Sequence, residues 1–428
     1  MEQEVKLGKA VRISGVAIMR VGLGLMAAML VPLAGAQASA PTQQTYTAAE
    51  FSVAKKDFEQ IRPRVSGKYV VWQDYRNLPG VVYDDAKTNA DIFARDLDAN
   101  TESKISDKHT AARPAISGNR IVFADNRNKD RSCNNSTCGI DIHGYSIDTG
   151  EVLDIVEHSG DQDFPAIDGA IVVWQDNRDG DWDIRGYYFE RDEHFVVVAH
   201  DGDQIRPAVS GTIVAWEDHR SSDGPDIYAR DVTRDDTPAR ITDDSDSRDP
   251  ALSIPWLAYR TGDPDGDSQR IKLVNLATGE TRTVTDRIRL GSGPRISGNL
   301  VVWSDIRNDE DHNVWGYDIG SGTQFRITGA DKDQTGPDIS GTTVAWEDAR
   351  GESPRDIRGA RLSPSASATP TTKSAAALTT ATQPAAQGPV SQGPCFFRLG
   401  IQSLHDLTPT VGDCRESAWH SAQKGDEL

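Results

Sequence analysis

The sequence predicts an all-β fold, a seven-bladed β-propeller built from four-stranded antiparallel blades. The first observation is a repeat, marked by a proline ahead of a short apolar step at Pro63, Pro114, Pro165, Pro207, Pro250, Pro294 and Pro337. Successive prolines are 51, 51, 42, 43, 44 and 43 residues apart. The second is the order that follows each proline: an apolar residue, Ser-Gly, a run such as Val-Val-Trp, then Asp-x-Arg and an Asp-Ile-Tyr-like step. A period of roughly 40–45 residues that holds four short strands is typical of propeller blades.

The repeat at residues 204–242 defines the expected strands of one blade. The first runs from Pro207 to Ser210, and Gly211 provides the backbone freedom of a tight turn. The second comprises residues 213–218, the third 226–232 and the fourth 239–242. The second strand is apolar at consecutive positions, whereas a sheet with one wet face would alternate. Such a strand needs both faces buried, as they are when each blade packs between two neighbours.

The two ends of the repeat predict how the ring closes. The last copy, Pro337 to Leu362, supplies three strands and stops, while Glu50 to Ala54 resembles a fourth strand with no first three. We therefore expect the N-terminal strand to complete the last blade, which removes two exposed sheet edges. Blade five is the weakest copy, because Ile254-Pro255 replaces Ser-Gly and residues 259–261, Tyr-Arg-Thr, replace Trp-x-Asp.

The segments outside the repeat predict export and a tail. In residues 1–40 an apolar run of 15 residues, Val21 to Gly35, is short for a membrane span, and residues 36–40 fit a small-x-small cleavage site. We expect a signal peptide, a mature chain that starts near Pro41, and a secreted, periplasmic or cell-surface location. An uncleaved anchor is the alternative, and Met19 is an alternative start. Residues 363–394, rich in Ser, Thr, Ala and Pro, predict a disordered linker, followed by a small cysteine-containing segment at 395–428.

Four cysteines in an exported chain predict two disulfides. Cys133 and Cys138 would pin the long loop of the second blade, and Cys395 and Cys414 would staple the C-terminal segment. A redox-active pair is the alternative. Neither pair has the neighbouring ligands of a zinc site.

The pattern Pro-x-Ile-Ser-Gly, Val-Val-Trp-x-Asp-x-Arg, Asp-Ile-Tyr, Ile-Thr resembles the TolB-like (PD40, WD40-like) propeller repeat of bacterial exported proteins, over about residues 46–362. The resemblance implies the propeller fold and an extracytoplasmic location. It implies no single activity, because propellers host many. The C-terminal step Val-Gly-x-Cys-x-Glu resembles the opening of a small module of such proteins, of which this chain would hold a part.

The predicted binding residues lie in loops that would emerge on one face of the ring. The loops between the second and third strands start with Asp-x-Arg steps, at Asp74 and Arg76, Asp125 and Arg127, Asp176 and Arg178, Asp218 and Arg220, Asp305 and Arg307, and Asp348 and Arg350. The segments that lead into the first strands carry Arg62, Arg113 and Arg206, together with Gln60, Gln162, Gln204 and Gln334. One interpretation is a polar ring that binds a peptide or glycan. The other is structural, with each Asp accepting hydrogen bonds from loop amides and each Arg pairing with a nearby Asp.

A calcium site is a further hypothesis. Asp176, Asp179, Asp181 and Asp183 crowd one loop of the third blade, and residues 263–267 hold three more aspartates. Oxygen clusters of this kind suit calcium, although neither fits the EF-hand pattern. Solvated acidic loops without an ion are the alternative.

Two functions from different classes remain open at this stage. The net charge of −19 argues against nucleic acid and anionic membranes as partners, and we expect a monomer. The sequence shows no nucleophile elbow, His-Glu-x-x-His motif or phosphate loop. A catalytic residue should stand out as an inward-pointing polar residue in a single blade, and blade five is the only strong departure from the consensus. Its change to Tyr259 is typical of packing, which favours a non-catalytic scaffold that binds a protein or glycan. The alternative is a carbohydrate-active enzyme, a glycoside hydrolase or lyase, with its site at the channel mouth.

Overall fold

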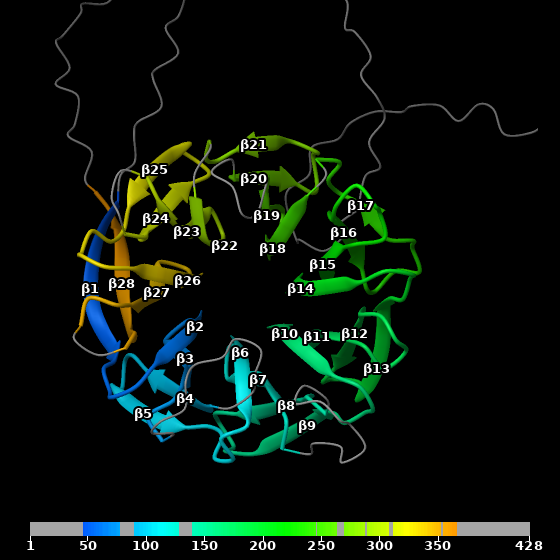
Figure 1. The fold of residues 1–428 in the computed structure, drawn as a ribbon, viewed down its shortest axis with the longest axis horizontal. Helices are drawn as coiled ribbons and strands as arrows, with labels where there is room; N and C mark the ends of the chain where they lie inside the picture. Colours follow the sequence, from blue (N-terminus) through cyan, green and yellow to red (C-terminus); the bar gives the residue numbers. More distant parts are fainter. Residues whose placement is uncertain are drawn as a thin grey trace, which may run out of the picture. The chain divides into compact units, whose positions relative to one another are not determined.

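Seven four-stranded antiparallel sheets surround a central channel in the computed structural model (Figure 1). The structure describes residues 46–77, 90–127, 139–244, 246–262, 269–286, 289–307, 311–351 and 354–365. These residues contain no helix that could cross a membrane. The predicted fold class, a seven-bladed propeller, is confirmed.

The strands follow one order in each blade, from the channel outward. Blade 1 holds β2 (Gln60–Ser66), β3 (Tyr69–Asp74), β4 (Asp91–Asp96) and β5 (Thr101–Lys104). Blade 2 holds β6 (Ala111–Ser117), β7 (Arg120–Asp125), β8 (Asp141–Ser146) and β9 (Val152–Val156), and blade 3 holds β10 (Gln162–Asp168), β11 (Ile171–Asp176), β12 (Asp183–Tyr188) and β13 (Glu193–Val198). Blade 4 holds β14 (Gln204–Ser210), β15 (Ile213–Asp218), β16 (Asp226–Asp231) and β17 (Ala239–Arg240). Blade 5 holds β18 (Ser247–Ser253), β19 (Trp256–Thr261), β20 (Arg270–Asn275) and β21 (Thr281–Thr283), and blade 6 holds β22 (Arg289–Ser297), β23 (Leu300–Ile306), β24 (Asn313–Asp318) and β25 (Thr323–Arg326).

Blade 7 joins the two ends of the propeller. It consists of β26 (Gln334–Ser340), β27 (Thr343–Asp348), β28 (Asp356–Pro364) and, outermost, β1 (Tyr46–Ala54) (Figure 1). The pairing of β1 with β28 runs from Tyr46 opposite Pro364 to Ala54 opposite Ile357. The predicted closure is therefore confirmed, and the closing strand starts at residue 46 instead of 50. The last strand also extends two residues into the segment that we expected to be linker.

The hydrophobic core lies between neighbouring blades. In β3, Trp72 packs in one cluster with Val53 of β1 and Ala345 of β27, which belong to blade 7. The next residue toward the N-terminus, Val71, packs in another cluster with Phe123 of blade 2. Side chains of a strand alternate between its faces, so consecutive apolar residues serve two interfaces. The prediction that both faces of the second strands are buried is confirmed.

The recurring Ser-Gly step links each blade to the next. The serine at the end of one innermost strand accepts a hydrogen bond from the backbone N–H of the following blade's turn, as Ser66 does from Gly118 at 2.8 Å. The other links are Ser117 to Gly169, Asp168 to Gly211, Ser210 to Ile254, Ser253 to Gly298, Ser297 to Gly341 and Ser340 to Gly67, at 2.7–3.3 Å. Blade 5 therefore keeps its serine, Ser253. The expectation that Ile254-Pro255 replaces Ser-Gly was wrong, because only the turn after the serine differs.

Several predictions concern residues outside the described ranges. The signal peptide, the linker beyond residue 365 and the C-terminal segment belong to this group. So do the four cysteines, Cys133, Cys138, Cys395 and Cys414, and the aspartates of residues 263–267. Export and both disulfides remain predictions.

Candidate functional site: the central channel

The Asp-x-Arg residues form pairs within their own blades. Asp218 accepts hydrogen bonds from Trp216 Nε1 at 2.9 Å and from Arg220 Nε and Nη2 at 2.7 and 2.6 Å. The same Trp–Asp contact recurs at Asp74, Asp176, Asp305 and Asp348, at 2.5–3.0 Å, and all five aspartates are at most 1% exposed. Arg76, Arg127, Arg178, Arg307 and Arg350 each bond the Asp two residues before them. This geometry is that of the structural interpretation, in which the recurring residues stabilise each blade.

The recurring glutamines also support local structure. Gln60, Gln162, Gln204 and Gln334 are the first residues of innermost strands instead of loop residues, and each is fully buried. The Nε2 of Gln204 donates to the carbonyls of His200 and Gly202, at 3.1 and 2.5 Å. The glutamines therefore anchor the loops that enter each blade.

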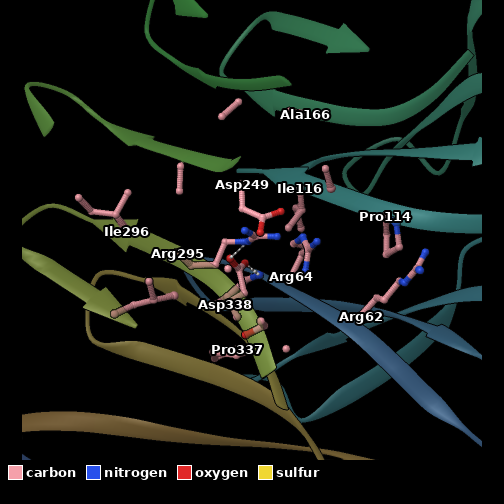
Figure 2. A pocket seen from close by; sticks show the side chains of 18 of the residues that line it. Arg62, Arg64, Pro114, Ile116, Ala166, Asp249, Arg295, Ile296, Pro337 and Asp338 are labelled. Carbon is pink, nitrogen blue, oxygen red and sulfur yellow. Dashed lines mark hydrogen bonds and ion pairs between the residues drawn. The ribbon is translucent and has the colours of Figure 1, made fainter. Parts of the chain in front are cut away.

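The innermost strands enclose a channel cavity of about 1040 Å³ (Figure 2). Residues of all seven blades line it, including three of the predicted binding residues, Arg62, Arg113 and Arg206. None of the predicted Asp-x-Arg residues is among its lining residues. The predicted binding residues therefore form two groups: the three arginines line the channel, and the Asp-x-Arg residues lie outside its lining.

The residues before the recurring prolines form one ring of the channel lining, the pre-proline ring. In six blades this residue has a φ between 51° and 56°, at Arg62, Arg113, Phe164, Arg206, Asp249 and Gly336. Gly293 holds the position in blade 6. The left-handed region is unusual for residues other than glycine. This left-handed residue lies at an irregularity in the pairing of the first strand with the second, such as that between Ile205 and Ala208. An irregularity of this kind is the signature of a β-bulge. The backbone is thus repeated around the ring while the side chains vary in chemistry.

Ion pairs and an aromatic ring connect the varied side chains. Arg113 Nη1 lies 3.2 Å from Asp163 Oδ1, and Arg206 Nη1 lies 2.6 Å from Asp249 Oδ1. The guanidinium groups of Arg113 and Arg206 lie 4.8 and 5.9 Å from the centroid of the Phe164 ring. Although burial acts to raise it, Arg206, Arg260 and Arg295 hold the pKa of Asp249 below its usual range. Blades 2–4 thus present the aromatic ring of Phe164 together with two cations, one from blade 2 and one from blade 4.

A second ring lies one residue beyond the prolines and is charged on one side only. Alanine occupies this position in blades 2–5, whereas Arg295, Asp338 and Arg64 occupy it in blades 6, 7 and 1. Figure 2 shows Arg64, Asp249, Arg295 and Asp338 gathered at one side of the channel. Burial, with a further contribution from Arg295, lowers the pKa of Arg64 to about 10. The charged side of the channel therefore spans the boundary where the ring closes.

Blade 6 carries a histidine that was not among the predicted site residues. His312 lines the channel, and its backbone N–H and Nδ1 lie 2.9 and 3.1 Å from Asp333 Oδ1. Another loop histidine, His219, has its Nε2 3.6 Å from Glu217 Oε2. The expectation that blade 5 is the only strong departure was wrong, because the pairing of blade 6 has a second irregularity between Leu290 and Ser292. The position before the third strand varies between blades, so it offers no pattern that would single out His312; the other blades have Ala90, Ile140, Trp182, Pro225, Gln269 and Arg355.

The four aspartates proposed for calcium each have a partner within the protein. Asp176 pairs with Arg178, Asp179 with Arg185 at 2.5 Å, and Asp181 Oδ2 accepts from the Gly202 N–H at 2.9 Å. Asp183 Oδ1 accepts from the His200 N–H at 3.3 Å. Within the described ranges, the group that brings three ligand atoms within 4.8 Å is instead His143, Asp154 and Glu157 in blade 2. Calcium binding at residues 176–183 remains a prediction.

The sequence matches no known family profile and no curated protein. Solved structures with the same fold include the β-propeller domain of the trilobed protease from Pyrococcus furiosus, with a TM-score of 0.55, 14% identity, and 74% of this chain and 100% of that chain covered. An oligogalacturonate lyase in complex with manganese matches with a TM-score of 0.54 and 10% identity, over 74% of this chain and 98% of that chain.

Acylaminoacyl peptidase from Pyrococcus horikoshii matches with a TM-score of 0.51 and 12% identity, over 70% of this chain and 51% of that chain. TolB from Acinetobacter baumannii also matches, at 14% identity over 68% of this chain and 82% of that chain, with a TM-score of 0.44. The propeller fold is therefore shared with the other propeller proteins named above. Membership of the TolB-like repeat family remains a prediction.

These comparisons correct one prediction from the sequence. The chain was expected to be a non-catalytic scaffold, but the similar solved structures include several peptidases and a lyase. The scaffold prediction was therefore wrong, and the alternative of an enzyme with its site at the channel mouth fits better. At 10–16% identity the likeness shows the fold and leaves the reaction to be argued from the channel.

Proposed function

We propose that this protein is a carbohydrate-active enzyme of the lyase type that binds an anionic oligosaccharide at the mouth of its channel. The observation that carries the proposal is the charge of the channel wall. Acidic residues outnumber basic ones by 65 to 46 in the chain, yet six arginines and five carboxylates line the channel. The arginines are Arg62, Arg64, Arg113, Arg206, Arg295 and Arg355. Arginine suits planar carboxylates because its fork of N–H donors matches them.

The pre-proline ring of the channel supports an oligosaccharide as the ligand. Phe164 is partly exposed between Arg113 and Arg206, so an apolar face and two cations are available within one stretch of wall. Ligand sites commonly combine apolar or aromatic surface with a few polar groups that fix orientation. A sugar ring that carries a carboxylate has both an apolar C–H face and an anion, and it fits this combination.

The propeller accounts for different shares of the similar enzymes. The propeller spans 98% of the similar oligogalacturonate lyase but about half of the acylaminoacyl peptidase. In the lyase, a propeller of this size makes up nearly the whole protein. Elimination from a uronate also requires little more than a positioned base and cations near the carboxylate, and the channel offers groups of both kinds.

Titration calorimetry tests the binding part of the proposal. Oligogalacturonate and a neutral galactose oligomer of equal length are titrated into the protein at low and high salt. We expect binding of the anionic oligomer alone, weakened by salt and by the double substitution R113Q/R206Q. R361Q removes an arginine of β28 that pairs with Asp98 away from the channel lining, and it serves as the control. Equal binding of the two oligomers, or an R113Q/R206Q variant that binds like the wild type, would contradict the proposal.

A further inference from the structure

We infer that His312 is the catalytic base of this channel, oriented by Asp333 and accommodated by Gly291 of blade 6. The inference rests on the proposed function and names the residue that removes the substrate proton. It is carried by three observations: the hydrogen bonds of the imidazole, the packing of Gly291, and the pairing of β22.

The hydrogen bonds of His312 fix the orientation of its ring. One carboxylate oxygen, Asp333 Oδ1, lies within hydrogen-bond distance of both the His312 backbone N–H and Nδ1. Burial acts to raise the pKa of Asp333, but its hydrogen bonds with the backbone and ring of His312 hold it below its usual range. An ionised carboxylate only accepts, so Nδ1 carries the hydrogen and the lone pair is on Nε2. The basic nitrogen is thus the one directed away from Asp333.

The glycine wall consists of Gly291, Gly293 and Gly336, which all line the channel. A Cβ at Gly291 would lie 2.4 Å from Cδ2 and 2.8 Å from Nε2 of His312. The basic nitrogen therefore lies beside the channel wall, at a position that glycine alone can occupy without displacing the ring. In the same way, Gly293 and Gly336 accept the close approach of Asp249 and Glu347. His312 and Glu347 thus approach glycines of their own blades, and Asp249 of blade 5 approaches a glycine of blade 6.

The pairing of β22 differs from that of the other innermost strands. Each of the others shows one register shift, at the position of its proline, whereas β22 shows a second between Leu290 and Ser292. The additional shift leaves Gly291 without a partner in β23. Extra residues of this kind are over-represented next to active sites, where they redirect the chain. Blade 6 thus departs from the repeat at the residue that contacts the His312 ring.

The proposed step is an elimination that needs no additional reactant. Nε2 of His312 takes the proton from C5, the ring carbon that bears the carboxylate, and the C5–H electron pair forms the C4–C5 double bond. The C4–O bond breaks with its electrons, and the leaving oxygen takes a proton from the imidazolium or from water. Negative charge that develops on the carboxylate side is stabilised by the channel arginines.

The test compares H312Q with a matched control, H219Q, which alters another loop histidine paired with a carboxylate but outside the channel lining. Turnover of oligogalacturonate is measured, and calorimetry reports whether each variant still binds it. General-base catalysis contributes about 10²–10⁴-fold, so we expect H312Q to lose activity by about that factor while KM changes little. We expect H219Q to retain wild-type turnover.

D333N tests the positioning role of Asp333. An asparagine can donate to Nδ1 and so favour the wrong tautomer, and we expect kcat to fall with KM and binding nearly unchanged. An H312Q variant that binds and turns over oligogalacturonate like the wild type overturns the inference and leaves the proposed function standing. A wild-type protein that does not bind oligogalacturonate overturns both.

Discussion

Oδ1 of Asp333, in the loop that enters blade 7, lies 2.9 Å from the backbone nitrogen and 3.1 Å from Nδ1 of His312, at the start of the third strand of blade 6. The two residues are 21 positions apart in the chain and belong to adjacent blades. Their contact joins the two loop types that emerge on the same face of a propeller. It places a histidine of defined orientation at the mouth of a channel rich in arginines.

Enlarging Gly291 should disturb this arrangement without unfolding the blade. The Cβ of G291A would overlap the His312 ring, so the ring must move. A misplacement of about 1 Å can cost about 10²-fold in rate, and we expect a loss of that order in kcat/KM with an unchanged melting temperature. G320A, in the turn after β24, is the control. A G291A variant with normal turnover would show that the ring position does not matter.

Removal of a recurring aspartate should affect stability and leave ligand binding intact. In D218A, Arg220 and Trp216 lose their buried acceptor, and breaking such a pair costs on the order of 3 kcal/mol. D223N, at an exposed residue of the same loop, should cost nearly nothing. Urea unfolding measures the difference. Loss of oligogalacturonate affinity in D218A at full stability would instead support a binding role for the Asp-x-Arg steps.

Asp141 provides a prediction about pH. Burial, with weaker contributions from neighbouring acidic groups, raises its pKa to about 7, and a hydrogen bond from the His158 N–H partly offsets this. A carboxyl with a raised pKa in the folded protein destabilises it when ionised, above pH 7, and this cost disappears as the pH falls toward the unfolded pKa of about 4.

D141N should therefore stabilise the protein at pH 8 and have little effect near pH 4. Asn313 already occupies the equivalent ladder position in blade 6, so the amide is compatible with the fold. One pKa unit corresponds to about 1.4 kcal/mol, and we expect a gain on the order of 1–3 kcal/mol at pH 8. Thermal unfolding at both pH values measures it. A gain of equal size at pH 4 and pH 8 would contradict the electrostatic explanation.

The closing strand should be required for stability. Deletion of residues 41–56 removes β1, exposes the edge of β28 and uncovers the apolar surface that Val53 covers. Burial of a side chain of this size is worth roughly 1.5–3 kcal/mol, against a total of about 5–15 kcal/mol. We expect a markedly lower melting temperature and aggregation through the open edge. Deletion of residues 366–428 leaves β28 whole and should melt like the parent, whereas parent-like melting of the 41–56 deletion would refute the closure.

The sequence predicted the fold well because the repeat encodes it directly. The consecutive apolar residues of each second strand, such as Val71 and Trp72, serve two blade interfaces and so recur in most copies. The incomplete copies at the two ends predicted the closure for the same reason. What recurs is what every blade needs, and the Trp–Asp–Arg contacts and the Ser–Gly links belong to that set.

The candidate site was harder to predict because it consists of departures from the repeat. The residues before the prolines share a backbone conformation while their side chains vary, so a search for recurring motifs passes over Phe164 and Asp249. His312 depends on Asp333, and no local pattern connects residues that meet through the packing of two blades. Gly291 is a single additional residue, and it changes the repeat length by one.

Product analysis tests the central claim most directly. Oligogalacturonate is incubated with the wild-type protein, and the fragments are identified by mass spectrometry and ultraviolet absorbance. We predict fragments with an unsaturated uronate at the new non-reducing end, each lighter by one water than the corresponding hydrolysis product. Intact oligogalacturonate after prolonged incubation, or saturated fragments that have gained water, would contradict the assignment of this channel to a lyase.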